Sequence, residues 1–209
     1  MQKLVRGIHR FQSNYFARNK ELFEQLATCG QKPETLFITC SDSRVVPEYI
    51  TSAAPGEMFI IRNIGNVVPR WGSTQAGGVV AAIQYAVEFL EVGDVIICGH
   101  TGCGAMQAIL EPERLAKLDH VRMWLDQTKS IREIIDTRYA HLVGEARLTA
   151  SVEENVLFQL DNLRHFPFVA DRLEAGKLRL SGWVFKIATG EVFRYEPERE
   201  EFEVLLEER

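Results

Sequence analysis

The stretch TLFITCSDSR at residues 35–44 decides the fold, because a short apolar, β-prone run ends there in a polar loop. EMFIIR at residues 57–62 and DVIICGH at residues 94–100 repeat this form. Short continuous apolar runs are typical of parallel strands that are buried on both faces. The three segments therefore predict buried parallel strands that carry functional groups at their C-terminal ends.

Helical patterns separate and follow these strands, over residues 75–90 and through much of 105–175. Strands that alternate with helices imply right-handed crossovers and a parallel sheet. Two later β-prone segments, residues 178–187 and 191–195, flank a short turn and predict a hairpin or strand pair. We expect an α/β fold with a central, mostly parallel sheet flanked by helices.

The two ends of the chain differ from its middle. Residues 2–28 carry apolar positions at helical spacing, which predicts one or two amphipathic helices that stop at Gly30. The acidic tail, residues 196–209, is expected to be a solvated surface segment, although its apolar side chains could dock on the body or on a partner. Without a repeat or a low-complexity linker, residues 1–209 are expected to form one domain, with 1–30 as an N-terminal helical arm.

The composition excludes several classes of protein. With 209 residues, 46% hydrophobic and 25% charged, the chain has the ordinary balance of a globular domain. The net charge is −5 and the Lys and Arg residues are scattered, so no basic surface for a nucleic acid is expected. The apolar runs are too short for a membrane span of ~20 residues or for a signal peptide. These features favour a cytoplasmic protein.

Three residues have the spacing of a metal site. His100 and Cys103 stand three positions apart at a strand-to-helix turn, and Cys40 ends a strand that could lie beside them. Two thiolates and one imidazole are good zinc ligands, and three protein ligands leave a fourth position open, as catalytic zinc requires. Each part alone is weak, because a buried His-x-x-Cys pair often holds no metal. The combination predicts a catalytic zinc centre.

The other thiols and imidazoles have simpler interpretations. Cys98 lies inside a strand and is read as a small buried hydrophobe, and Cys29 ends a helix. Four cysteines are too few for a secreted disulfide scaffold of this length. The remaining histidines have no spacing that recruits them to the centre and are expected at the surface or at helix caps: His9, His120, His141 and His165.

Asp42 and Arg44 are the candidates for catalysis beside the metal. Asp42 follows the ligand Cys40 by two positions, and Arg44 can hold its carboxylate bidentately and lower its pKa. Held in this way, Asp42 could orient a zinc-bound water or hydroxide. Released from Arg44, it could occupy the fourth position itself. An Asp-x-Arg pair is most often a surface ion pair, which is the alternative here.

Four motifs together resemble the β-carbonic anhydrases, above all the plant-type and cyanobacterial members. They are CSDSR at 40–44, PGEMFIIRNIGN at 55–66, GHTGCGAM at 99–106 and SGWVF at 181–185, so the resemblance spans nearly the whole chain. It implies reversible hydration of carbon dioxide to bicarbonate and a proton by zinc-bound hydroxide. One Zn²⁺ per subunit would be held by Cys40, His100 and Cys103, with Asp42 and Arg44 as the catalytic pair.

The resemblance also implies a small apolar substrate pocket, with Gln31 as amide donor and Phe59, Ile64 and Tyr85 as walls. Ordinary core packing is the alternative for the last three. In the family Gln31 and part of the wall come from the neighbouring subunit, so a homodimer or a higher even oligomer is expected, with the arm reaching across. Association with a carboxysome is possible.

One departure from the family bears on regulation. Another subtype binds an inhibitory bicarbonate with a tryptophan, an arginine and a tyrosine, and the corresponding residues here are Phe37, Arg62 and Phe185. Two hydrogen-bond donors are lost in this set. We therefore expect no bicarbonate-gated closure.

Three other functions remain open from the residues alone. The same site could hydrolyse carbonyl sulfide or carbon disulfide, which are also linear molecules. A zinc scaffold without turnover would show the same ligand spacing, although Asp42 and Arg44 argue against it. A redox role for the cysteines is disfavoured, because the chain has no Cys-x-x-Cys pattern.

Overall fold

The computed structural model describes residues 1–73 and 77–206 of the chain. Its contacts divide the chain into two compact units, Met1–Lys32 and Pro33–Arg209, and each is described by itself. In the parts that are described, no helix combines the length and the apolar character that crossing a membrane requires.

The N-terminal unit is helical, as the sequence predicts. It contains α1 (Gln2–Arg10), a π-helical segment η1 (Phe11–Phe16) and α2 (Lys20–Cys29). Gly30 ends α2 with a positive φ of 74°, a conformation that glycine adopts without strain. The rings of Phe16 and Phe23 lie 5.1 Å apart and join η1 to α2. Helix α1 buries no side chain within this chain, so its apolar residues are available to a partner.

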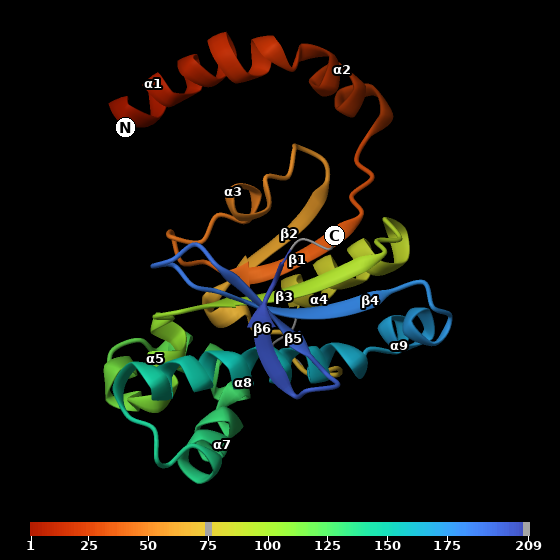
Figure 1. Cartoon of the computed structure of the whole chain (residues 1–209). Helices are drawn as coiled ribbons and strands as arrows, with labels where there is room; N and C mark the ends of the chain where they lie inside the picture. Colours follow the sequence, from red (N-terminus) through yellow and green to blue (C-terminus); the bar gives the residue numbers. More distant parts are fainter. Residues whose placement is uncertain (74–76, 207–209) are drawn as a thin grey trace. The chain divides into compact units, whose positions relative to one another are not determined.

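Six strands form one sheet in the order β2-β1-β3-β4-β5-β6 (Figure 1). The first four are mutually parallel: β1 (Thr35–Cys40), β2 (Met58–Asn63), β3 (Asp94–His100) and β4 (Arg179–Phe185). The last two, β5 (Val192–Glu196) and β6 (Glu201–Val204), are antiparallel. The mostly parallel sheet is therefore confirmed, and the strand pair predicted over 178–187 and 191–195 is the antiparallel pair of β4 and β5.

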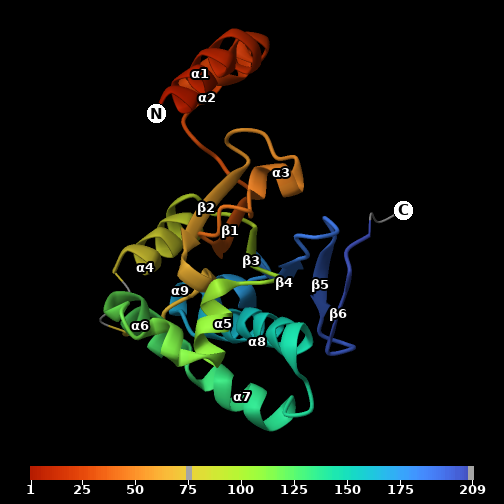
Figure 2. The same cartoon turned by 90° about the vertical axis from the view of Figure 1, so that its left-hand side faces the viewer.

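Helices connect the strands and flank the sheet (Figures 1 and 2). The helix expected over 75–90 is present as α4 and η3, although residues 75 and 76 lie outside the described part of the chain. The segments are α3 (Pro47–Thr51), η2 (Ile64–Asn66), α4 (Gly77–Gln84), η3 (Tyr85–Phe89), α5 (Gly104–Leu110), η4 (Pro112–Leu115), α6 (Asp119–Leu125), η5 (Asp126–Thr128), α7 (Ser130–Arg138), α8 (Gly144–Arg164) and α9 (Pro167–Glu174).

Two glycines let α8 pack closely on the middle of the sheet. A Cβ atom at Gly99 of β3 would lie 2.8 Å from a methyl group of Val152. A Cβ atom at Gly182 of β4 would lie 2.8 Å from a methyl group of Val156. Any larger residue at these positions would push α8 away from the sheet, and Gly99 directly precedes His100.

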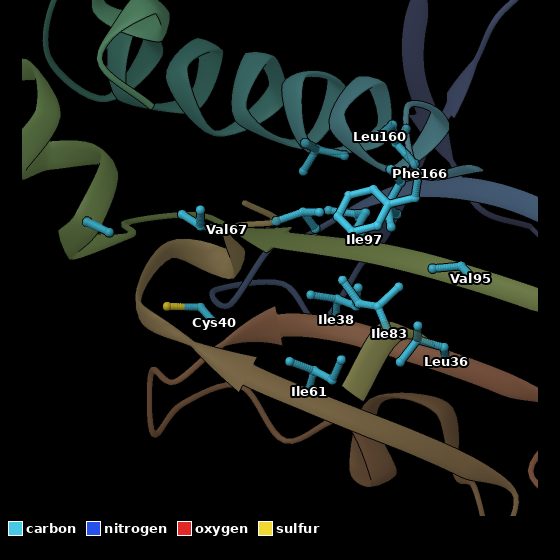
Figure 3. Close-up of a cluster of buried hydrophobic side chains, with 14 of the residues drawn as sticks. Leu36, Ile38, Cys40, Ile61, Val67, Ile83, Val95, Ile97, Leu160 and Phe166 are labelled. Atoms are coloured by element: carbon cyan, nitrogen blue, oxygen red, sulfur yellow. The ribbon is translucent and has the colours of Figure 1, made fainter. Parts of the chain in front are cut away.

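The main core lies between the sheet and the helices on one of its faces. Figure 3 shows Leu36, Ile38 and Ile97 in this cluster, and Cys40 at one end of it, on the side of the segment that carries Val67. The strand alternation places Phe37 on the opposite face, where its ring packs edge-on against Trp183 at 6.0 Å. Both faces of β1 are therefore filled, which fixes the position of Cys40 at its end.

The acidic tail corrects one expectation. Residues 201–204 are not a solvated segment but the edge strand β6, paired with β5 through Tyr195↔Phe202. Charged and apolar residues alternate in Glu-Phe-Glu-Val, and Phe202 is half-buried while Glu201 and Val204 at the two ends are exposed. The ring of Phe202 lies 5.3 Å from that of Tyr195, which confirms docking on the body. Residues 207–209 of the tail lie outside the described part.

Candidate metal centre

The centre is built where two neighbouring parallel strands end. Cys40 is the last residue of β1 and His100 the last of β3, and these strands pair through Thr39↔Cys98. Cys103 follows as the residue before α5. In the sheet, β1 lies between β2 and β3, so the strand order reverses direction beside β1. In α/β sheets, binding sites form at such switch points, at the carboxyl ends of the strands. The three residues are buried, and their ligand atoms lie within 4.8 Å of one another.

The orientation of His100 leaves one ring nitrogen free for a metal. Its Nδ1 lies 3.0 Å from the carbonyl oxygen of Thr101, and because a carbonyl only accepts, Nδ1 carries the hydrogen. Nε2 then offers a lone pair, and it is buried without a hydrogen-bond partner. A buried unpaired nitrogen is unfavourable, and a metal ion would satisfy it. With two thiols beside it, this donor set fits zinc.

The thiols of Cys40 and Cys103 interact with each other, and their pKa values shift in opposite directions. The pKa of Cys40 is lowered to about 4, first by the hydrogen bond from the Cys103 thiol and further by the backbone of Gly65 and Asp42, while burial opposes the shift. The pKa of Cys103 is raised, first by its hydrogen bond to Cys40 and then by burial. The protein therefore stabilises a thiolate at Cys40, and a thiolate is the form that binds metal.

Asp42 is held rigidly beside the ligands. Its Oδ1 accepts from the backbone N–H and the Nε of Arg44, both at 3.0 Å, and its Oδ2 accepts from Arg44 Nη2 at 2.8 Å. The hydrogen bonds from Arg44 are the main cause that depresses the pKa of Asp42. Arg44 Nη2 also donates to the carbonyl of Gly102 at 3.1 Å. Asp42 Oδ2 lies 3.8 Å from His100 Nε2, too far for a hydrogen bond but close enough for both to contact one small ligand.

A cavity of about 430 Å³ opens beside Asp42. Cys40, Ser41 and Ile64 line one side of it. The rest is supplied by α5, α6 and the segment between them, with mostly apolar side chains: Gly104, Ala105, Gln107, Ala108, Arg114, Leu115, Leu118, Val121 and Leu125. The sequence reasoning missed this wall. The position of Gln107, one helical turn after Cys103, is a signal that could have pointed to it.

The other predicted pocket residues lie elsewhere in this chain. Phe59 and Tyr85 are not among the lining of this cavity; their rings lie 5.9 Å apart, and Tyr85 stacks on Phe89 at 4.8 Å. Tyr85 is 42% exposed. Gln31 belongs to the N-terminal unit and is exposed. Of Phe59, Ile64 and Tyr85, only Ile64 lines the cavity, and the roles of Gln31, Phe59 and Tyr85 stay predictions.

The remaining cysteines are packed or exposed as expected. Cys98 is fully buried, and burial raises the pKa of its thiol to about 12, so it is held in the neutral form. Cys29 is exposed. The four histidines outside the centre all lie at the surface: His9, His120, His141 and His165.

Arg62 has a role that the sequence did not reveal. Its Nη2 donates to the carbonyl of Asp42 at 2.7 Å and its Nε to the carbonyl of Cys40 at 3.2 Å. The guanidinium therefore holds both ends of the Cys-Ser-Asp turn. The sequence had placed Arg62 only at the position of an anion ligand.

A mostly parallel α/β fold thus brings Cys40 and His100, at adjoining strand ends, together with Cys103 in the turn before α5, and this donor set fits a zinc site. Residues 35–192 match the family described as carbonic anhydrase. The chain belongs to the carbonic anhydrase family, in its β class, and it is an enzyme of that family.

Curated relatives and solved structures agree. The chain is 47% identical over 192 residues to a carbonic anhydrase of Pseudomonas aeruginosa, covering 92% of this chain and 86% of that one. It is 44% identical over 197 residues to one of Synechocystis, covering 94% and 71%. The structure of the β-carbonic anhydrase CcaA superposes with a TM-score of 0.95 at 43% identity, over 98% and 99% of the two chains. One of two β-carbonic anhydrases of Sordaria macrospora, both described as tetrameric, gives 0.84 at 27% identity, over 92% and 95%.

Proposed function

We propose that this chain catalyses the reversible hydration of carbon dioxide to bicarbonate and a proton, with one zinc ion per subunit held by Cys40, His100 and Cys103. The observation that carries the proposal is the convergence of three buried ligand atoms within 4.8 Å, one of them the unpaired Nε2 of His100. Membership of a family of zinc enzymes supports it. Zinc bound there supplies the positive charge that makes water ionise near neutral pH.

Asp42 is proposed to orient the reacting water. The three hydrogen bonds from Arg44 keep its carboxylate ionised and fix its two oxygens. Because Oδ2 lies 3.8 Å from His100 Nε2, it can accept a hydrogen bond from a water at the centre and hold one lone pair of that water toward the substrate. Arg44 acts through Asp42 and, by its bond to Gly102, joins this carboxylate to the turn that carries Cys103.

The substrate is proposed to enter the cavity lined by Ile64. Carbon dioxide is small, neutral and linear, so apolar walls suit it better than charged ones. In our proposal Gln31, Phe59 and Tyr85 of a neighbouring subunit complete this pocket, in a homodimer or a higher even oligomer. The exposed ring of Tyr85 and the unburied apolar residues of α1 support such an assembly. Location in the cytoplasm, free or within a carboxysome, remains a prediction.

Metal analysis and stopped-flow hydration of carbon dioxide test the proposal. The zinc-loaded protein is expected to contain one zinc per subunit and to be active, and Asp42→Asn is expected to retain zinc but lose about 100-fold or more in kcat/KM, the size of a lost acid–base or orienting group. Asp161→Asn, the same change on an exposed side chain, should leave the rate unchanged. A zinc-loaded wild type without activity would refute the proposed function.

A further inference from the structure

The segment Asn63–Val68, which begins at the last residue of β2, passes directly beside the centre. Hydrogen bonding from the Gly65 backbone is one of the causes that lower the pKa of the Cys40 thiol. The strand register agrees, since Cys40 is paired with Asn63 and the N–H of Ser41 bonds to the Asn63 carbonyl at 2.8 Å. Ile64, the residue before Gly65, lines the cavity. The orientation of the Ile64–Gly65 peptide therefore bears on both the ligand and the pocket.

The same peptide is held from its other side by Trp124. The indole Nε1 of Trp124 donates to the carbonyl oxygen of Ile64 at 2.8 Å, across 60 positions of sequence. In a trans peptide the carbonyl and the N–H point in opposite directions. A donor that holds the carbonyl of Ile64 thus directs the N–H of Gly65 toward Cys40, and hydrogen bonds in such a chain polarise one another.

The neighbouring atoms leave this peptide little freedom. Gly65 has φ +78°, and a Cβ atom there would lie 3.0 Å from the Cβ of Ala105 in α5. Its own carbonyl accepts from Asn155 Nδ2 of α8 at 3.0 Å. Asn155 in turn accepts from Gln159, which also binds the N–H of Val68. The segment is therefore fixed on both sides of the peptide that Trp124 holds.

We infer that Trp124 is a positioning residue of the metal centre, which acts through the Ile64–Gly65 peptide on the sulfur of Cys40. The inference rests on the proposed function, because it assumes that Cys40 binds the metal. Trp124 touches neither the ligand atoms nor the reacting molecules in this role. Its contribution is to fix the orientation of the Ile64–Gly65 peptide beside Cys40, and with it the direction of the candidate ligand's sulfur.

The chain offers a matched pair of variants for the test. Trp124→Phe removes the indole N–H and keeps an aromatic ring. Trp183→Phe makes the same change at a tryptophan whose Nε1 donates to Ser181 Oγ at 2.9 Å, away from the segment Asn63–Val68. Both variants lose one indole hydrogen bond, so any difference between them reports the contact with Ile64 rather than a general loss of packing.

The measurements are zinc affinity and the absorption spectrum of the cobalt-substituted protein. They are made on full-length variants whose circular dichroism matches that of the wild type. We expect Trp124→Phe to bind zinc roughly tenfold more weakly in competition with a chromogenic chelator, as for other groups that orient metal ligands. Its thiolate-to-cobalt charge-transfer band should also shift. Trp183→Phe should match the wild type in both. If Trp124→Phe prevents folding, benzothienylalanine is placed at position 124 instead, because its ring has the size of indole but no N–H. The same changes in zinc affinity and cobalt spectrum are then expected.

The outcomes separate the two claims. A wild type that binds no stoichiometric metal and shows no thiolate band would refute the proposed function. A wild type that binds metal normally, with Trp124→Phe equal to it in affinity and spectrum, would overturn only the role of Trp124. Equal losses in Trp124→Phe and Trp183→Phe would overturn it as well, because they would show a general effect of losing an indole bond.

Discussion

Replacing Gly182 by alanine should destabilise the fold through a single steric contact. Gly182 lies in β4 with an ordinary backbone conformation, so the added methyl causes no backbone strain. It would lie 2.8 Å from a methyl of Val156 and 2.9 Å from one of Leu160, both in α8. Carbon atoms pack at about 3.5–4.0 Å, so α8 must move by about 1 Å or its side chains must leave their rotamers. Overpacking of this size costs about 1–3 kcal/mol.

Urea unfolding of the zinc-loaded protein at one fixed concentration measures this cost. Gly182→Ala should lower the free energy of unfolding by about 1–3 kcal/mol, and Val156→Ala in the same chain should recover part of it by removing the methyl that clashes. Gly78→Ala in α4, where an added Cβ meets no atom within 4 Å, should cause no loss. If Gly182→Ala unfolds at the wild-type midpoint with an unchanged slope, the close packing of α8 on β4 is not what sets the stability.

Two further predictions concern the thiol of Cys98 and the response to bicarbonate. Burial raises the pKa of Cys98 to about 12, so above pH ~8.5 the unfolded chain loses this proton while the folded chain keeps it, and stability falls as pH rises. The stability advantage of wild type over Cys98→Ala should shrink by about 2 kcal/mol between pH 8 and pH 10 in urea titrations, and a constant difference would contradict the assignment. High bicarbonate should not inhibit hydration cooperatively, because Phe37 is buried against Trp183 and Arg62 holds the carbonyls of the Cys-Ser-Asp turn. Crystals with the anion beside Arg62 and Asp42 turned to the metal would contradict this.

The strands could be predicted almost to the residue, and the tail could not. A strand buried on both faces, such as Thr35–Cys40, is a continuous apolar run, and its ends are marked by polar residues. The edge strand Glu201–Val204 is apolar on one side only and sits among acidic residues, so its alternation was hidden by the composition. The packing of Gly99 and Gly182 against α8 is also absent from local sequence, because it depends on which helix crosses the sheet there.

The candidate ligands could be predicted because each one ends a strand or begins a helix, where a short motif records its place. Asp42 and Arg44 could be predicted for a similar reason, because they are two positions apart in sequence and hydrogen-bond to each other. The cavity wall from Leu115 to Leu125 looks like ordinary core in sequence. The bond from Trp124 to Ile64 joins residues 60 positions apart and has no local signal.

The residues of the candidate metal centre therefore come together within one chain, whereas those of the proposed substrate pocket do not. The candidate ligands come from β1, β3 and the turn before α5, and one chain holds them together with filled core on both faces of the strands. Of the predicted pocket residues, only Ile64 reaches the same cavity within one chain. Phe59 and Tyr85 do not line the cavity of their own chain, so in our proposal they serve the pocket of a second copy. Assembly would then govern the use of substrate, while the folding of a single chain already brings the three candidate ligands together.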